Sequence, residues 1–597
     1  MIQDWRTLLS IFTARERLQI YLLLANATVM GLIDVAGIAS VMPFIAVLLD
    51  DGIIESNPYL HAVYVYFGFD SHAHFEVALG VFSLATLIVS NAFSAFEMWF
   101  MYRFCFLRTH SLCIRLLATY LHQPYLAFLQ RNRAELHKII VSDVDRVVVG
   151  TLMAGIGLFA DVVSALFIVA LLFFVDLMVT AATLFALGAS YLAVHLTIRK
   201  RITQLGEEFV TLDTAIVART QEALENMKEI KVAGREDEFL RRLADPRHRF
   251  ALNAIRHNTL DLVPSRVIEV VAFGAIIVVA LYYLLGSDTS SNVLPVIALY
   301  AFAAYRLVPT LKEIFDGIDT IRYNAPALEV ISKDFDRTGA EPRPREARPE
   351  PRPLRHGIAI ENVSFAYPGV KAPAVQGLRM HIPAGRLTCI MGPTGAGKST
   401  ALDLVLGLLR ADTGRILIDG MQLEASAADE WRASIGYVPQ AVSLIDDTVA
   451  SNIAFGMQAE DIDVARLHEA ARRAQIHEFI VNGLPSSYDT VLGEKGLRLS
   501  SGQRQRIGLA RALYVDPPVL VLDETTNALD ARTERQIIDC LLALEPRRTI
   551  VFVSHKASVA RHAAGIVIVE EGAVVAEGAY RDLAFDARFR ELLTDVE

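Results

Sequence analysis

The sequence predicts an α-helical polytopic membrane domain of six transmembrane helices, followed by an α/β P-loop domain. Two observations on composition indicate the membrane domain: 53% of the 597 residues are hydrophobic, and the mean hydropathy is +0.36. Both values are high for a soluble protein, and the chain is too long for one domain. The third observation is a glycine-rich loop with a lysine, residues 392–400, between an apolar strand and an apolar helix.

Apolar stretches in the first half of the chain predict the transmembrane helices. A spanning helix needs about 20 apolar residues, and such stretches occur near 18–49, 76–107, 150–174, 177–198, 264–285 and 293–313. The connections 50–75, 175–180 and 286–292 contain no Lys or Arg, whereas 108–149 and 199–263 contain many. Basic loops stay in the cytoplasm. We therefore expect a multi-pass protein of the inner (plasma) membrane, with both termini and the second domain in the cytoplasm.

Changes in composition along the chain predict the domain boundaries. Residues 1–336 form the expected membrane domain, with long cytoplasmic helical extensions, and within it 150–198 also allows a different division into spans. Residues 1–17 mix arginines with apolar side chains, which predicts an amphipathic elbow helix on the cytoplasmic surface and not a signal peptide. The segment 337–354 is rich in Pro, Arg and Glu and predicts a solvated linker. Strands, Gly turns and helices alternate over 355–597, the expected α/β nucleotide-binding domain.

Charge and cysteine content exclude some classes of partner. The formal net charge is −10 and the pI about 5.9, so the chain lacks the basic field of a nucleic-acid-binding protein. The cysteines show neither metal-ligand spacing nor a disulfide pattern, and we expect buried thiols at Cys105, Cys113, Cys389 and Cys540.

The glycine-rich loop has the pattern of a Walker A motif. Its glycines let backbone N–H groups turn toward phosphate oxygens, Lys398 supplies a positive charge, and Ser399 supplies a hydroxyl for Mg²⁺. The helix that follows points its N-terminus at the phosphates. We therefore expect an ATP site whose loop residues are Gly392, Thr394, Gly395, Ala396, Gly397, Lys398, Ser399 and Thr400.

Polar residues at the ends of three other strands complete the expected chemistry. Asp523 follows four apolar residues and can reach Mg²⁺, while Glu524 can polarise the attacking water. A buried carboxylate pair is costly without a cation, which argues against a purely structural pair. His555 ends another apolar strand and is placed to touch the γ-phosphate, although a lone His there is usually a core residue. Tyr367 ends an edge strand and is expected to stack on adenine; the alternative is an aromatic that packs on the domain surface.

These motifs, in this order, resemble those of ATP-binding-cassette (ABC) exporter half-transporters along the full chain. The series of motifs comprises Tyr367, the Walker A loop, the Gln loop with Gln440, the segment 493–496, the cassette motif 499–503, Glu524, the turn 528–530 and His555. One departure is Ser501, where the family usually has Gly. The intact acidic and histidine positions imply an ATP hydrolase coupled to translocation, with ATP and Mg²⁺ as cofactors.

The resemblance also implies a dimer. Two cassettes would close head-to-tail, each ATP lying between one Walker A loop and the partner's cassette motif, whose residues are Ser500, Ser501, Gly502 and Gln503. Gln440 would join Ser399 and Asp523 as a Mg²⁺ ligand. One cassette per chain and no degenerate catalytic position predict a homodimer. The cytoplasmic segments 130–143 and 222–234 are the expected coupling segments.

Several membrane residues resemble the subgroup that flips lipid-linked oligosaccharides: the segment 34–45, Pro264 with Glu269, and the segment 305–309. A charge at mid-bilayer costs about 2.5–3.5 kcal/mol on insertion scales, so Arg306 needs a reason to be there. An anionic head group on a lipid-linked substrate would supply one. Alternatively, Arg306 snorkels or pairs with an acidic neighbour. The candidate substrate residues are Arg306, Asp34 and Glu269.

Other functions remain open or are disfavoured. A multidrug or lipid exporter of the same fold is the main alternative, since only the cavity would differ. A peptide exporter is less favoured because no Cys/His peptidase precedes the first span. An ATP-gated channel or regulator would tolerate loss of the general base, so the intact Glu524 and His555 count against it. The transmembrane spans exclude a soluble cassette ATPase that acts on DNA.

Overall fold

The chain folds into two compact units, which we describe separately. The computed structural model describes residues 2–49, 52–173, 177–286, 293–338, 349–370, 372–493, 499–525, 530–544 and 548–594. Contacts assign Met1–Gln123 and Phe128–Arg343 to the first unit. They assign Pro124–Ala127 and Pro344–Glu597 to the second.

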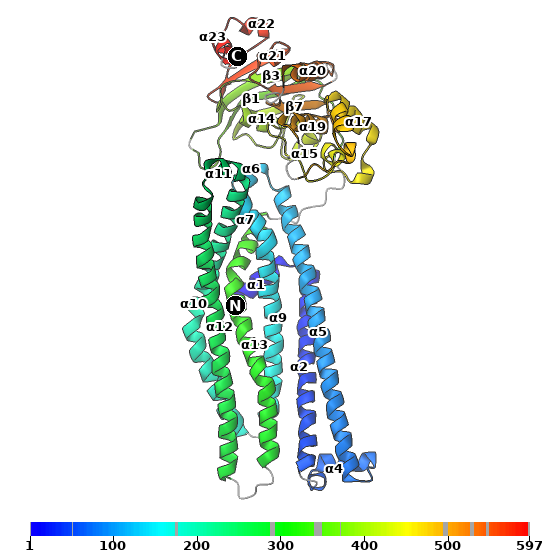
Figure 1. Ribbon diagram of the computed structural model, residues 1–597, viewed down its shortest axis with the longest axis vertical. Helices are drawn as coiled ribbons and strands as arrows, with labels where there is room; N and C mark the ends of the chain where they lie inside the picture. The colour runs from blue at the N-terminus through cyan, green and yellow to red at the C-terminus, as the bar shows by residue number, and fades with distance from the viewer. Residues whose placement is uncertain are drawn as a thin grey trace. The chain divides into compact units, whose positions relative to one another are not determined.

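The first unit is built from long helices that run side by side (Figure 1). These are α2 (Ala14–Leu49), α5 (His72–His122), α9 (Ala154–Phe173), α10 (Leu177–Glu225), α12 (Glu236–Gly286) and α13 (Val293–Thr338). Among the described residues, two helical stretches are long and apolar enough to cross a membrane by length and composition, His72–His122 and Arg133–Phe173. The count of six spans therefore stays a prediction.

Short helices connect or precede the long ones. They are α1 (Ile2–Ile11), α3 (Ile53–Ser56), α4 (Pro58–Phe67), α6 (Tyr125–Leu129), α7 (Arg133–Lys138), α8 (Val144–Val147) and α11 (Met227–Ala233). Two π-helical segments, Ile139–Asp143 and Val148–Met153, flank α8, so the chain from α7 to α9 is helical with local widening.

The N-terminal helix α1 buries apolar side chains against other helices of this unit, and its expected place on the cytoplasmic membrane surface stays a prediction. Leu8, Ile11 and Phe12 are buried in a cluster of apolar side chains from other helices of this unit. The ring of Trp5 lies against Gly155 at the start of α9, where a Cβ atom would come within 2.4 Å of it. Part of the apolar surface of α1 therefore packs on protein.

The second unit contains two sheets. The strands β2 (Val375–Pro383), β1 (Gly357–Phe365), β4 (Thr413–Ile418) and β5 (Met421–Gln422) form an antiparallel sheet in that order. The second sheet has the order β10 (Ala573–Gly578), β9 (Gly565–Glu570), β3 (Leu387–Met391), β8 (Thr549–Val553), β7 (Val519–Asp523) and β6 (Ile435–Val438).

All pairs of the second sheet are parallel except β10 with β9. The strands β3, β8 and β7 are apolar along most of their length because both faces of a parallel sheet are covered. Their carboxyl ends therefore lie at the same edge, where ligands bind in such sheets.

The helices of the second unit are α14 (Lys398–Val405), α15 (Ala428–Ala433), α16 (Val449–Ile453), α17 (Val464–Arg473), α18 (His477–Gly483), α19 (Ser501–Tyr514), α20 (Ala531–Leu542), α21 (Ala557–Ala560), α22 (Tyr580–Leu583) and α23 (Ala587–Thr594). Their apolar faces contribute to two hydrophobic clusters that share the central strands.

The expected coupling segments stay predictions. Pro124–Ala127, just before the first of them, is grouped with the second unit, where Leu126 packs against one of its hydrophobic clusters. The other expected segment, 222–234, contains α11 and lies in the first unit.

Candidate active site

The loop after β3 has a backbone that requires glycine. Gly392, Gly395 and Gly397 have φ angles of 151°, 82° and 97°. A Cβ atom on Gly392 would lie 2.0 Å from the carbonyl oxygen of Val569, and one on Gly397 would lie 2.6 Å from that of Ala374. Only glycine tolerates these left-handed angles and these close carbonyl contacts. The resulting loop can turn its backbone N–H groups toward a bound phosphate.

Lys398, at the first position of α14, points back into this loop. Its Nζ donates to the carbonyl oxygens of Gly392 at 2.8 Å and Pro393 at 2.9 Å. Burial lowers the pKa of Lys398, and the nearby Glu524 and Asp523 oppose that shift. The lysine is therefore held over the loop by acceptors that phosphate oxygens would replace.

Two side chains from different elements hold the carboxylate of Glu524. Gln440 Nε2 donates to Oε2 at 2.7 Å, and His555 Nε2 lies 3.2 Å from Oε1. The backbone of Glu524 is left-handed, with a φ of 46°, and its N–H donates to the carbonyl of Val553 in β8. A strained non-glycine residue held this firmly is typical of a functional position.

Burial and charge perturb the titration of the groups around this carboxylate. Burial lowers the pKa of His555, and Lys398 adds to that effect while Glu524 opposes it. Burial also raises the pKa of Asp523, as does the adjacent Glu524. A bound cation would relieve this carboxylate repulsion, and the oxygens of Ser399, Gln440 and Asp523 are of the type that Mg²⁺ prefers. These residues therefore fit a Mg²⁺ ion.

A third carboxylate, not predicted from the sequence, lies near this edge. Burial raises the pKa of Asp403 on α14 to about 6, and Asp523 contributes to the shift. Burial and both aspartates raise the pKa of Tyr437, which lies in β6 just before the Gln loop. The signal in the sequence is an acidic residue among the apolar residues 401–406.

Tyr367 lies beside the start of α14. Its hydroxyl is 3.3 Å from Thr400 Oγ1, and its ring meets that of Phe365 edge-on with centroids 5.0 Å apart. Stacking on adenine stays a prediction.

The cassette motif forms the N-terminus of α19. Ser500 is the N-cap: its Oγ accepts from the backbone of Gln503 at 3.2 Å, and Gln503 Oε1 accepts from the backbone of Ser500 at 2.8 Å. This capping box leaves Ser501 and Gly502 in the first turn. Among the described residues, no hydrogen bond joins this helix start to the Walker A loop.

Parts of two motifs lie outside the described residues. These are 494–496, after Gly493, and 528–529, before Asp530. Asp530 is the N-cap of α20 and accepts hydrogen bonds from the backbone of Arg532 and Thr533.

Comparison with known proteins identifies the family. The family described as ABC transporter transmembrane region matches residues 25–309, and the ABC transporter family matches 375–527. An ATP-dependent lipid A-core flippase of Cupriavidus pinatubonensis is 30% identical over 468 residues, which cover 78% of each chain. The chain belongs to the ABC transporter family.

Other relatives agree with this assignment. The ATP-dependent lipid A-core flippase of Escherichia coli K12 is 30% identical over 386 residues, 65% of this chain and 66% of that protein. A solved structure of a bacterial Atm1-family ABC exporter with ATP bound superposes with a TM-score of 0.78 at 26% identity, and 97% of each chain is covered.

The comparisons confirm the predicted fold class, an exporter-type membrane region followed by an α/β nucleotide-binding domain. This ABC exporter is a membrane protein that couples ATP hydrolysis to translocation, with ATP and Mg²⁺ as cofactors.

In this ABC exporter, the candidate substrate residue Glu269 pairs with an arginine other than Arg306. Glu269 on α12 forms an ion pair with Arg266, with Nη1 and Oε2 2.8 Å apart. Arg306 on α13 is half-buried, and its carbonyl accepts a hydrogen bond from Thr310. The side chain of Asp34 lies outside the described residues. Glu269 thus already has an arginine partner on its own helix.

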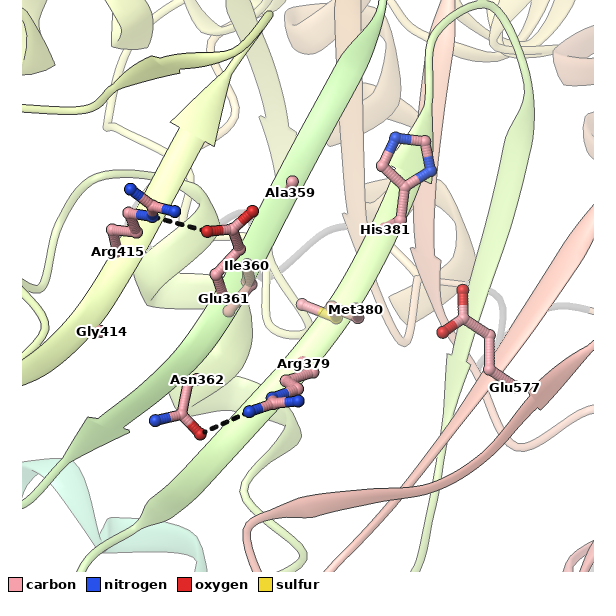
Figure 2. A pocket seen from close by; sticks show the side chains of 10 residues that line it. All are labelled: Ala359, Ile360, Glu361, Asn362, Arg379, Met380, His381, Gly414, Arg415 and Glu577. Carbon is pink, nitrogen blue, oxygen red and sulfur yellow. Dashed lines mark hydrogen bonds and ion pairs between the residues drawn. The ribbon is translucent and has the colours of Figure 1, made fainter.

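A hollow of about 820 Å³ on the antiparallel sheet is separate from the nucleotide residues (Figure 2). It is open and crossed by the pairs Arg415–Glu361 at 2.5 Å and Arg379–Asn362 at 3.5 Å. The lining is Ala359, Ile360, Glu361, Asn362, Arg379, Met380, His381, Gly414, Arg415 and Glu577. None of the motif residues contributes to it.

Proposed function

We propose that this ABC exporter is an ATP-driven flippase for an anionic glycolipid. Two relatives at 30% identity carry the name lipid A-core flippase, and the membrane domain places the half-buried Arg306 on α13. Lipid-linked oligosaccharides and lipid A-core glycolipids share a phosphate-bearing head group and long acyl or prenyl chains. That shared chemistry is the substrate class we propose.

The observation that carries the ATP-driven part of the proposal is the carboxylate of Glu524, held between Gln440 and His555. We assign Glu524 the role of general base and His555 that of a γ-phosphate contact. Lys398 and the loop around it hold the phosphates, and Tyr367 stacks on adenine. Ser399, Gln440 and Asp523 hold Mg²⁺, as argued above.

We further propose a homodimer in the inner membrane, with both termini cytoplasmic. Each ATP would lie between one Walker A loop and the cassette motif of the partner, residues 500–503. The position of these residues supports this role, because Ser500 to Gln503 form the N-terminal turn of α19 and a helix N-terminus is a favourable site for a phosphate. The division into domains 1–336, 337–354 and 355–597 also stays a proposal.

Within the membrane domain, we propose that Arg306 contacts the substrate phosphate. A guanidinium can bind phosphate oxygens through two parallel hydrogen bonds, which an ammonium cannot match. The pairing of Glu269 with Arg266 supports this role because it gives Glu269 a partner other than Arg306. Asp34 and Glu269 remain candidate contacts to the sugar.

The test is substrate-stimulated ATPase activity of the full chain in lipid vesicles. We expect a lipid A-core glycolipid or a polyprenyl-diphosphate oligosaccharide to stimulate hydrolysis in the wild type. Arg306→Ala should lose this stimulation while basal hydrolysis and melting temperature stay near wild type, and Arg306→Lys should recover only part of it. Stimulation by neutral amphipathic drugs alone would favour the alternative, a multidrug exporter. Equal loss of basal activity and stability in Arg306→Ala would assign the arginine a structural role.

A further inference from the structure

Glu534 is a buried carboxylate that the ATP-binding motifs do not include. It lies in the first turn of α20, and the residue is 7% exposed. Its Oε2 accepts from Lys556 Nζ at 2.8 Å, and its Oε1 accepts from Ser558 Oγ at 2.7 Å. Both donors follow His555 closely in the chain, so one carboxylate binds the segment after the histidine at two points.

The same segment is fixed at its other end by β3. The N–H of Ser554 donates to the carbonyl of Ile390 at 3.2 Å, and Ser554 Oγ accepts from the N–H of Lys556 at 3.1 Å. His555 lies between these attachments, with its Nε2 3.2 Å from Glu524 Oε1. The place of the imidazole therefore depends on a loop tied to β3 on one side and to α20 on the other.

The attachment to α20 consists of a buried ion pair and a second hydrogen bond, both to the carboxylate of Glu534. A carboxylate buried this deeply is stable only with a cation and further donors, and Lys556, whose side chain is 21% exposed, supplies the cation. The hydrogen bond from Ser558 occupies the second oxygen. Charge-assisted hydrogen bonds of this kind fix geometry better than neutral ones.

We propose that Glu534 is a positioning residue for ATP hydrolysis: it ties the loop after His555 to α20 and so holds the imidazole against the carboxylate of Glu524. Glu534 acts through the loop and touches neither nucleotide nor metal. Its loss should therefore reduce the rate of the chemical step and leave ATP binding almost unchanged.

The experiment measures kcat and KM for ATP in the purified full-length protein in lipid vesicles, together with its melting temperature. Glu534→Ala should lower kcat by about tenfold or more, because small misplacements of catalytic groups are costly, with KM within about twofold of wild type. Glu534→Gln keeps one acceptor oxygen for Lys556 and gains an N–H that can donate to Ser558 Oγ, so it should recover part of kcat. The matched control is Asp539→Ala, an exposed acid on the same helix, which should behave as wild type.

Other variants cover the case in which Glu534→Ala does not fold. Ser558→Ala and Lys556→Met each remove one donor and should each lower kcat by about threefold or more at unchanged KM. The proposal is overturned if Glu534→Ala, or both donor variants, retain wild-type kcat. It is also overturned if kcat, KM and melting temperature change together and Glu534→Gln restores none of them, since that pattern describes a purely structural ion pair.

Discussion

At the scale of single residues, the carboxylate of Glu524 is the group on which the proposed hydrolysis depends. Its strained backbone and its contacts with Gln440 and His555 hold it at the edge where β7, β8 and β3 end. Gln440 belongs to the loop after β6, so one carboxylate connects the Gln loop with the histidine loop. A water molecule polarised at this carboxylate would be positioned by both.

The first prediction concerns that carboxylate. Glu524→Gln should leave ATP affinity within about threefold of wild type and reduce hydrolysis by about a hundredfold or more, because the amide keeps the size but cannot act as a base. Nucleotide binding and phosphate release, measured on the same preparation, check it. A variant that hydrolyses ATP at a tenth of the wild-type rate would remove Glu524 from the role of base.

The second prediction concerns pH. The pKa of Asp403 is raised from 3.8 to about 6 in the folded protein, so the folded state binds more protons than the unfolded state between these values. This group's contribution to stability therefore falls as the pH rises through that window. Asp403→Asn should raise the melting temperature at pH 7.5 in Mg²⁺-free buffer, by about 2–4 °C, and the gain should shrink as the pH falls toward 4.

Thermal melting across this pH range, with the exposed Asp539→Asn as control, checks the second prediction. A gain that is the same at every pH would show that ionisation of Asp403 is not its source. A lower melting temperature at pH 7.5 would show that the carboxylate makes a net favourable contact.

At the scale of elements, the packing of α1 on α9 decides how the N-terminus is held. The Trp5 ring packs against Gly155, which has no side chain to exclude it. Glu16, at the start of α2, forms an ion pair with Arg108 at 2.5 Å and accepts a hydrogen bond from the backbone N–H of Thr13 at 2.9 Å. The steric fit at Gly155 and the ion pair of Glu16 thus add to the apolar packing that holds the first two helices on the rest of the unit.

The third prediction tests the steric fit. Gly155→Ala should lower the melting temperature by about 2–4 °C, because a Cβ atom would lie 2.4 Å from the Trp5 ring. Gly157→Ala, on the same helix with nothing within 4 Å, is the matched control and should be neutral or stabilising. The two alanine variants would melt alike if Trp5 did not occupy this place.

Elements with strong local signals were the ones that the sequence predicted well. The apolar runs of β3, β7 and β8 predicted where Asp523 and His555 would lie, because buried parallel strands carry nearly continuous hydrophobic residues. The contact of Gln440 with Glu524 could not be read in this way, since it depends on β6 and β7 being neighbours in the sheet. The burial of α1 likewise depends on distant helices, which leave no local pattern.

At the scale of the whole molecule, the chain combines a helical membrane unit with a nucleotide unit that also takes up Pro124–Ala127. That segment comes from the connection between α5 and α7, so part of the membrane half folds with the cassette. We expect this segment to transmit conformational changes of the nucleotide unit to the long helices.

The central claim, ATP-driven translocation of an anionic glycolipid by copies of this chain alone, is tested by reconstitution. The purified protein is placed in vesicles that carry a phosphate-bearing glycolipid in one leaflet, and the glycolipid that reaches the other leaflet is measured with ATP and Mg²⁺. We expect transfer that follows ATP hydrolysis and disappears with Glu524→Gln or without Mg²⁺. Hydrolysis with no glycolipid transfer, or equal transfer by the Glu524→Gln protein, would contradict it.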